Sequence, residues 1–164
     1  MARARAFTAF TLVELILVMG VLCIILSLAA PSLSRSMRQR NLMMEATRLL
    51  GLTEYARQEA VSYAVPTVVW TDPTTGEFGA NAKKGYEDAG VRNKQFKLTD
   101  GLHFDQDKES KPVASGTDSV EFAPDGTLDP SSQASFRLVD QSNSAVSVSQ
   151  TKDGMGYEIV RDYQ

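Results

Sequence analysis

The side chain with the clearest chemical role is a single carboxylate near the start of a long apolar segment. Glu14 is the only charged residue between Phe10 and Ala30, and an unpaired acid in a membrane helix costs about 2.5 to 3.5 kcal/mol. Cleavage between Ala9 and Phe10 would create an α-amine four positions before Glu14, on the same helical face and at the positive end of the helix dipole. This amine would neutralise Glu14 in its own chain or in a neighbouring chain, and a slip in register would leave both charges unpaired. We therefore interpret Glu14 as an assembly determinant.

Groups that could perform catalysis are scarce elsewhere in the sequence. His103 is the only histidine and Cys23 the only cysteine, so Ser-His and Cys-His catalysis are disfavoured and an intramolecular disulfide is impossible. Asp105, Asp107 and Glu109 alternate, but their spacing does not complete an EF-hand, and a solvated acidic loop is favoured over a calcium site. We expect no enzymatic activity, no metal and no cofactor.

The distribution of charge favours export and disfavours nucleic-acid binding. The net charge of the chain is −3. From Ala64 onward there are ten Lys and Arg residues and sixteen Asp and Glu residues, whereas a nucleic-acid-binding domain normally has a basic surface. A local basic cluster leaves direct DNA contact open, at Lys83, Lys84, Arg92, Lys94 and Lys97. Arg3 and Arg5 precede the apolar segment, a bias that holds an N-terminus in the cytoplasm and exports the remainder.

Two interpretations of the N-terminal segment compete. Residues 10–30 are long enough for one transmembrane helix across about 30 Å of hydrocarbon. A basic start, an apolar core and the A-x-A-like arrangement of Ser27, Leu28 and Ala29 are also typical of a cleavable secretory signal. The signal-peptide interpretation leaves Glu14 without a role, so the transmembrane helix is favoured.

The pattern after Pro31 predicts an amphipathic helix over residues 31–64. Pro31 removes a backbone donor, so a kink is expected there, near the membrane exit. Val65 is pushed toward extended geometry by Pro66, so the helix should end before it. The apolar stripe consists mainly of small residues and should pack on the domain that follows; it comprises Leu42, Ala46, Leu49, Thr53, Ala56, Ala60 and Tyr63.

The pattern of residues 65–164 predicts an antiparallel β domain. Short strand-like runs begin with Thr67 to Trp70, and Asp-Gly turn signals occur at Asp100 and Asp125. Trp70 and its neighbours are expected in the core. One long helix followed by strands alone predicts an α+β fold, with the sheet packed on the C-terminal half of the helix.

The sequence "AFTLVEL" resembles the prepilin N-methylation motif of type IV pilins and type II secretion pseudopilins, in which glycine is followed by F-T-L-x-E and a long apolar helix. The resemblance implies that a prepilin peptidase cuts between Ala9 and Phe10 and methylates the new amine of Phe10. It assigns Glu14 as the assembly glutamate and Thr11 and Leu12 as flanking motif positions.

The same resemblance implies that residues 1–9 are a cleaved leader, and Pro31 falls where many of these helices have a proline. The family strongly favours glycine before the cut. Ala9 departs from that pattern but keeps the small size, so slower processing is expected.

The β region is similar to type II secretion protein H and its type IV pilus relatives, in which a phrase like F-x-P-D-G, here "FAPDG", precedes a late strand pair. The resemblance implies a pilin-like minor pseudopilin, anchored in the inner membrane with its β domain in the periplasm and assembled into a short pseudopilus that drives protein export. Its expected partners are the prepilin peptidase, other major and minor pseudopilins, the inner-membrane assembly platform and exported proteins. Two alternatives remain, a minor pilin of a type IV pilus for assembly or DNA uptake, and an exported periplasmic binding domain.

Overall fold

The computed structural model describes the backbone of residues 11–105 and 118–161, and their side chains except those of residues 28–35 and Asp118. The expected leader 1–9, Phe10, Asp107 and Glu109 lie outside the described residues. The chain forms two compact units, Met1–Arg38 and Gln39–Gln164, and each is described by itself.

One long helix, α1, spans Leu12–Tyr63 and continues through Pro31. The kink expected at Pro31 stays a prediction. The helix ends before Pro66, as predicted: Ala64 adopts a left-handed φ of 54°, and the Val65 N–H donates to the Ala60 carbonyl at 3.2 Å. This arrangement satisfies a carbonyl of the last turn, as in a Schellman-type helix end.

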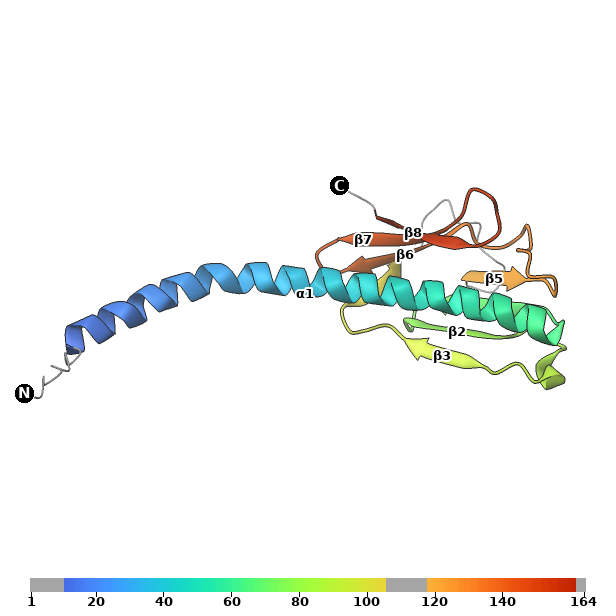
Figure 1. Cartoon of the computed structure of the whole chain (residues 1–164), viewed down its shortest axis with the longest axis horizontal. Coiled ribbons are helices and arrows are strands. Elements are labelled where there is room, and N and C mark those ends of the chain that lie inside the picture. Colours follow the sequence, from blue (N-terminus) through green and yellow to red (C-terminus); the bar gives the residue numbers. More distant parts are fainter. Residues whose placement is uncertain (1–10, 106–117, 162–164) are drawn as a thin grey trace, which may run out of the picture. The chain divides into compact units, whose positions relative to one another are not determined.

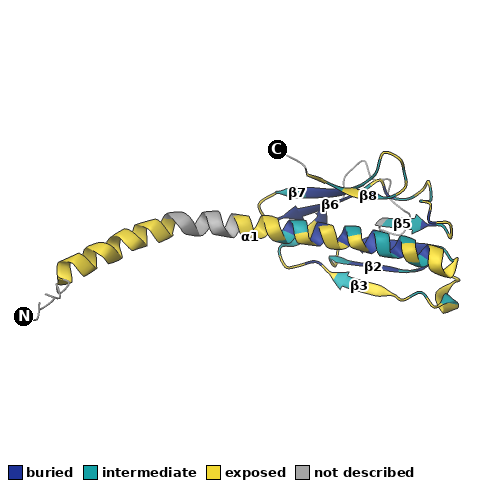
Figure 2. Ribbon diagram, in the orientation of Figure 1, coloured by how far each residue is buried: buried dark blue, intermediate teal, exposed yellow. Residues whose placement is uncertain are grey.

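In the second unit, one face of α1 is buried against the strands (Figure 2). The predicted stripe from Leu42 to Ala60 is buried throughout, but Tyr63 is 43% exposed. That prediction was wrong because Tyr63 is the last helical residue, where its ring lies beside Gly90 instead. The buried face is also wider than predicted, since Glu45 and Leu52 belong to it.

In the described residues after the helix, eight antiparallel strands form two four-stranded sheets (Figure 1). The first sheet has the order β3-β2-β1-β5 and the second has the order β4-β6-β7-β8. The strands are β1 (Thr67–Asp72), β2 (Glu77–Ala82), β3 (Lys94–Lys97), β4 (Leu102–Asp105), β5 (Asp118–Phe122), β6 (Ser135–Asp140), β7 (Ala145–Gln150) and β8 (Tyr157–Arg161).

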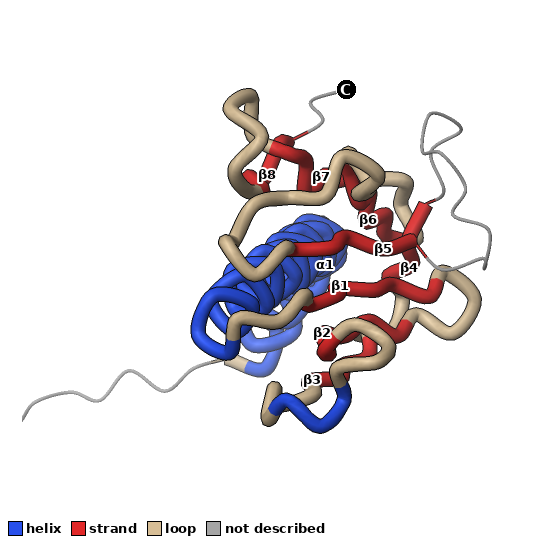
Figure 3. The backbone as a smooth tube through the Cα atoms, turned by 90° about the vertical axis from the view of Figure 1, so that its right-hand side faces the viewer, coloured by secondary structure: helices blue, strands red, loops and turns tan. Residues whose placement is uncertain are grey.

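This architecture confirms the predicted α+β class but replaces the single expected sheet with two. Viewed along the helix, strands of both sheets surround one side of the second-unit part of α1 (Figure 3). The shared core includes Val69 and Phe78 from the first sheet and Leu138 and Val148 from the second. There are two sheets because the chain alternates between them from β3 to β6. The pattern of residues within a strand does not indicate which distant strand it pairs with, so the second sheet could not be predicted.

The strand β2 has no clear strand signal in the sequence. Its core-facing positions are Phe78, Ala80 and Ala82, and alanine is depleted in strands generally. The segment between β2 and β3 contains the short 3₁₀ helix η1 (Glu87–Ala89). Trp70 was expected in the core; it is only half-buried because β1 alternates and turns Val69 inward instead.

Candidate functional site

The first turn of α1 is built from two residues of the FTLVE motif. The backbone N–H of Glu14 donates to the Thr11 hydroxyl at 3.3 Å, and the Leu15 N–H donates to the Thr11 carbonyl at 3.2 Å. Thr11 is therefore the helix N-cap, and Thr-x-x-Glu is the sequence of a capping box. The resemblance to the prepilin motif implied only a flanking role for Thr11, although the spacing of Thr11 and Glu14 is a sequence signal for the cap.

Glu14 lies in the first turn of α1 and its side chain is exposed. The positive end of the helix dipole favours a carboxylate at this position. Ala9 and Phe10 lie outside the described residues, so the pairing of the Phe10 amine with Glu14 stays a prediction. Leu12 is the first helical residue and is 76% exposed.

The helical residues after the cap present apolar side chains on all faces. Their exposed large hydrophobic residues are Leu12, Val13, Leu15, Ile16, Leu17, Val18, Met19, Val21, Leu22, Ile24, Ile25 and Leu26. Cys23 is exposed among them. A contiguous apolar surface of this kind marks an interaction site in proteins generally. Across the described part of the chain, no helix meets the combined length and hydropathy required of a membrane span.

A second feature is the turn formed by the FAPDG phrase. Phe122 is buried, and the Ala123 N–H donates to the Thr127 carbonyl at 2.9 Å. The Asp125 carboxylate accepts from the Thr127 N–H and hydroxyl at 2.9 and 2.6 Å, and these bonds lower the pKa of Asp125. Gly126 has φ +80°, and a Cβ there would lie 2.9 Å from Cγ2 of Val61 on α1. The phrase therefore closes a tight turn directly against the helix.

The basic cluster is partly engaged within the protein. The Lys83 ammonium donates to Glu121 at 2.6 Å, and this bond raises the pKa of Lys83. The Lys94 ammonium lies 3.5 Å from the centroid of the Tyr55 ring. Two of the five cations thus have partners that compete with a phosphate backbone.

Of the candidate catalytic and metal-binding residues in the β domain, the structure describes His103 and Asp105. His103 is exposed on β4, which is an edge strand of the second sheet. Asp105 accepts a charge-assisted hydrogen bond from Arg137 at 3.0 Å. Within the residues that the structure describes, no three His, Cys, Asp or Glu side chains form a metal-binding group.

Solved structures of a minor pseudopilin and of a minor pilin share this fold. The minor pseudopilin EpsH from the type 2 secretion system of Vibrio cholerae aligns with a TM-score of 0.54 at 14% identity, covering 74% of this chain and 97% of EpsH. The type IV minor pilin FimU of Pseudomonas aeruginosa aligns with a TM-score of 0.52 at 16% identity, covering 77% of this chain and 91% of FimU. No curated protein sequence matches the chain.

The sequence itself supplies the family assignment. The family model of the type II transport protein GspH matches residues 45–154, which is more than half of the chain and includes most of the buried helical stripe, the strands β1 to β7 and the FAPDG turn. The chain belongs to the type II transport protein GspH family.

Proposed function

We propose that this protein is a minor pseudopilin of a type II secretion system, a structural subunit and not an enzyme. It is held in the inner membrane by residues 10–30, with Gln39–Gln164 in the periplasm. A prepilin peptidase removes residues 1–9 and methylates Phe10. The mature chain then joins other pseudopilins in a short pseudopilus on the inner-membrane assembly platform and contributes to protein export.

The observation that carries the proposal is the lone acid in the exposed apolar helix. Among residues 11–27, Glu14 is the only charged side chain, and the large hydrophobic residues around it are exposed. Exposed apolar surface is stabilised when lipid or neighbouring helices remove it from water. A carboxylate in such surroundings needs a cation, and the mature Phe10 amine would supply one.

Processing is the first step to test. The chain is expressed with and without a prepilin peptidase, and the N-terminal peptide of the membrane fraction is examined by mass spectrometry. A methylated N-terminus at Phe10, formed only with the peptidase, is expected. A soluble product that begins near Ala30 would instead establish an ordinary secretory signal. The Ala9→Gly variant should be processed faster.

Assembly is tested separately with three variants. Glu14→Leu removes the charge, and we expect normal membrane insertion but at least a tenfold loss of incorporation into pseudopili, because the amine loses its partner. Glu14→Gln keeps the size and should show most of this loss. Thr11→Ala removes the N-cap but keeps the charge, so it should incorporate better than either. Incorporation of Glu14→Leu at the wild-type level would refute the assembly role.

The similarity to FimU favours one second candidate, a minor pilin of a type IV pilus. Both candidates use the same N-terminal helix, so they differ in their partners. Cross-linking of intact cells followed by identification of the neighbouring subunits separates them. Major pseudopilins among the products would support the secretion role, whereas major pilins would support the pilus role.

A further inference from the structure

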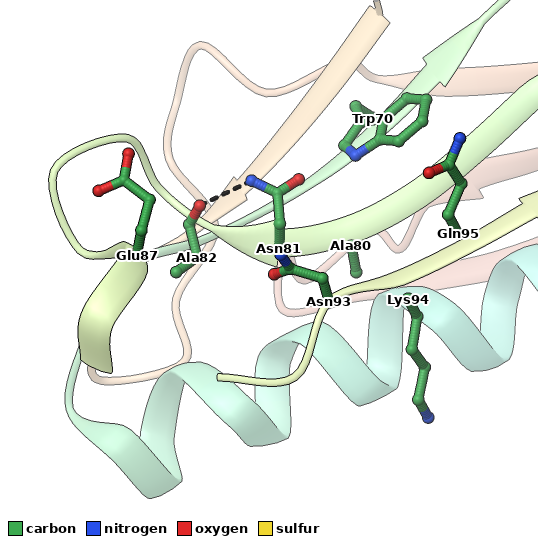
Figure 4. Close-up of a pocket in the computed structure, with 8 residues that line it drawn as sticks. All are labelled: Trp70, Ala80, Asn81, Ala82, Glu87, Asn93, Lys94 and Gln95. Atoms are coloured by element: carbon green, nitrogen blue, oxygen red, sulfur yellow. Dashed lines mark hydrogen bonds between the residues drawn. The ribbon is translucent and has the colours of Figure 1, made fainter. Parts of the chain in front are cut away.

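The outer face of the first sheet carries a small cavity beside the only tryptophan of the chain. Strand alternation turns Val69 and Phe78 into the core and leaves Trp70 half-buried on the opposite face. The cavity has a volume of about 190 Å³. It is lined by Trp70, Ala80, Asn81, Ala82, Glu87, Asn93, Lys94 and Gln95, which come from β1, β2, β3, η1 and the segment before β3 (Figure 4).

The indole of Trp70 is held flat by the residue opposite it. In the β1–β2 register Trp70 pairs with Gly79, and a Cβ on Gly79 would lie 2.8 Å from Cζ2 of the indole. The ring therefore covers the glycine backbone, and any larger residue would displace it. On the other side, the register partner of Trp70 is Ser119. A flat, half-exposed indole offers an apolar surface together with an N–H donor.

Hydrogen-bond acceptors are numerous in the lining. The amide nitrogen of Asn81 donates to the Ala82 carbonyl at 2.7 Å, which leaves the Asn81 Oδ1 as an acceptor. The amide nitrogen of Gln95 donates to the Glu77 carboxylate at 3.1 Å, which leaves its Oε1 likewise. Glu87 accepts the Gly85 N–H at 2.9 Å, and a carboxylate has further lone pairs available. The site therefore suits a ligand rich in O–H donors.

The charge of the lining disfavours anions. Lys94 is the one cation among the lining residues, and its side chain points toward α1, away from Trp70 and Asn81 (Figure 4), onto the ring of Tyr55 at 3.5 Å. Glu87 keeps a negative charge, because the Gly85 N–H holds the pKa of its carboxyl below the usual range. A phosphate or carboxylate ligand would meet this carboxylate without a facing cation.

We propose that this cavity binds one pyranose ring of a neutral sugar. The apolar C–H face of the ring stacks on the Trp70 indole, while its hydroxyls donate to Asn81 and Gln95, which lie on either side of the indole (Figure 4). The volume is below the range of about 300 to 1,000 Å³ typical of drug-sized ligands, which fits a single ring. This inference does not depend on the proposed role in secretion, since every residue that it uses belongs to the β domain.

The test uses the fluorescence of Trp70, which reports on the site directly because the chain has one tryptophan. The full chain is kept in a zwitterionic detergent without a sugar headgroup and titrated with glucose, N-acetylglucosamine and the β-1,4-linked trisaccharide of each. A saturable change in emission at millimolar sugar is expected, with saturation-transfer NMR signals on the ring C–H protons. Trisaccharides that bind no more tightly than single rings would show that one ring fills the site.

Control ligands separate stacking from simple hydroxyl binding. Mannitol has the hydroxyls without a ring and should cause no saturable change. Glucuronate adds a carboxylate and should bind several-fold more weakly than glucose. Equal responses to mannitol and glucose, or no saturable response to any of the sugars, would overturn the proposal.

Variants connect the response to the cavity. Asn81→Ala and Gln95→Ala should each weaken binding by about three- to tenfold, the loss expected for one hydrogen bond. Ser119→Ala alters the other flank of Trp70, outside the lining, and should bind as the wild type does. If Asn81→Ala and Ser119→Ala bind equally well, the sugar lies elsewhere and the proposal fails.

Discussion

The buried hydroxyl of Tyr157 shows how single residues stabilise the second sheet. Tyr157 is 5% exposed, and its ring lies 6.0 Å from that of Phe136 between centroids. Its O–H donates to the Gln133 carbonyl, in the segment that leads into β6. Burial raises the pKa of Tyr157, because the apolar surroundings disfavour the phenolate.

This raised pKa predicts a loss of stability in alkali. A group with a folded-state pKa above its unfolded value stabilises the fold below the unfolded value, which is about 10 for tyrosine, and loses that contribution as pH rises further. Tyr157→Phe should cost about 0.5 to 1.5 kcal/mol at neutral pH through the lost hydrogen bond. The variant should then lose less stability than the wild type above about pH 10, because it has no proton to release.

Urea unfolding of both proteins at neutral and alkaline pH measures this difference. Tyr86→Phe changes an exposed tyrosine and is the control. Its free energy of unfolding should match that of the wild type at both pH values. A gap between wild type and Tyr157→Phe that stays constant from neutral pH to about pH 11 would contradict the argument.

At the level of elements, the FAPDG turn connects the first sheet to the helix. The left-handed conformation of Gly126 brings its Cα so close to Val61 that a Cβ would overlap the valine methyl at 2.9 Å. Gly154 has a similar φ of +69°, but a Cβ there would meet only Gln150 at 3.8 Å. The two glycines thus share the backbone requirement and differ in the contact with α1.

Alanine substitutions at these two glycines measure the energetic cost of the contact with α1. Gly154→Ala should destabilise by about 1 kcal/mol from the backbone conformation alone. Gly126→Ala should cost about 1 kcal/mol more, because the turn must move away from α1. Val61 is 53% exposed, so Val61→Ala should cost little by itself and should recover the additional loss in the double variant. Urea unfolding of the four variants checks this; equal losses for both glycine substitutions would show that the Val61 contact carries no energy.

Sequence patterns predicted the elements with strong local signals and missed those that depend on pairing. The helix end before Pro66 and the stripe from Leu42 to Ala60 follow from proline stereochemistry and the 3.6-residue period. The burial of Glu45 could not be predicted, because its partner, the Thr99 hydroxyl at 2.7 Å, is 54 residues away. The outward position of Trp70 depends in the same way on the register that places it over Gly79.

The functional sites were also predicted only in part. The sequence singled out Glu14 by its charge alone, and its place in the first turn follows from the Thr-x-x-Glu spacing. The cavity beside Trp70 was not foreseen. Its lining combines residues from three strands and η1, and the spacing of Asn81, Glu87 and Gln95 shows no period that would bring them together.

For the whole molecule, the location of the core decides which part of the chain folds independently. The clustered buried hydrophobic residues that the structure describes begin with Leu42 and end with Tyr157, all within the unit Gln39–Gln164. A domain with its own core can in principle fold alone. Residues 12–26, in contrast, expose their large hydrophobic side chains and would lower the solubility of the chain in water.

A fragment spanning residues 39–164 should therefore be soluble and unfold cooperatively in urea, with a free energy within about 0.5 kcal/mol of that of the full chain in detergent. A matched control fragment, residues 51–164, lacks Leu42, Ala46 and Leu49, which are almost fully buried. Their loss exposes the core of both sheets, so the control should not unfold cooperatively. Circular dichroism and urea titration distinguish the two fragments. Non-cooperative unfolding of the 39–164 fragment would mean that residues before Gln39 contribute to the stability of the β domain, and that the core from Leu42 onward is insufficient by itself.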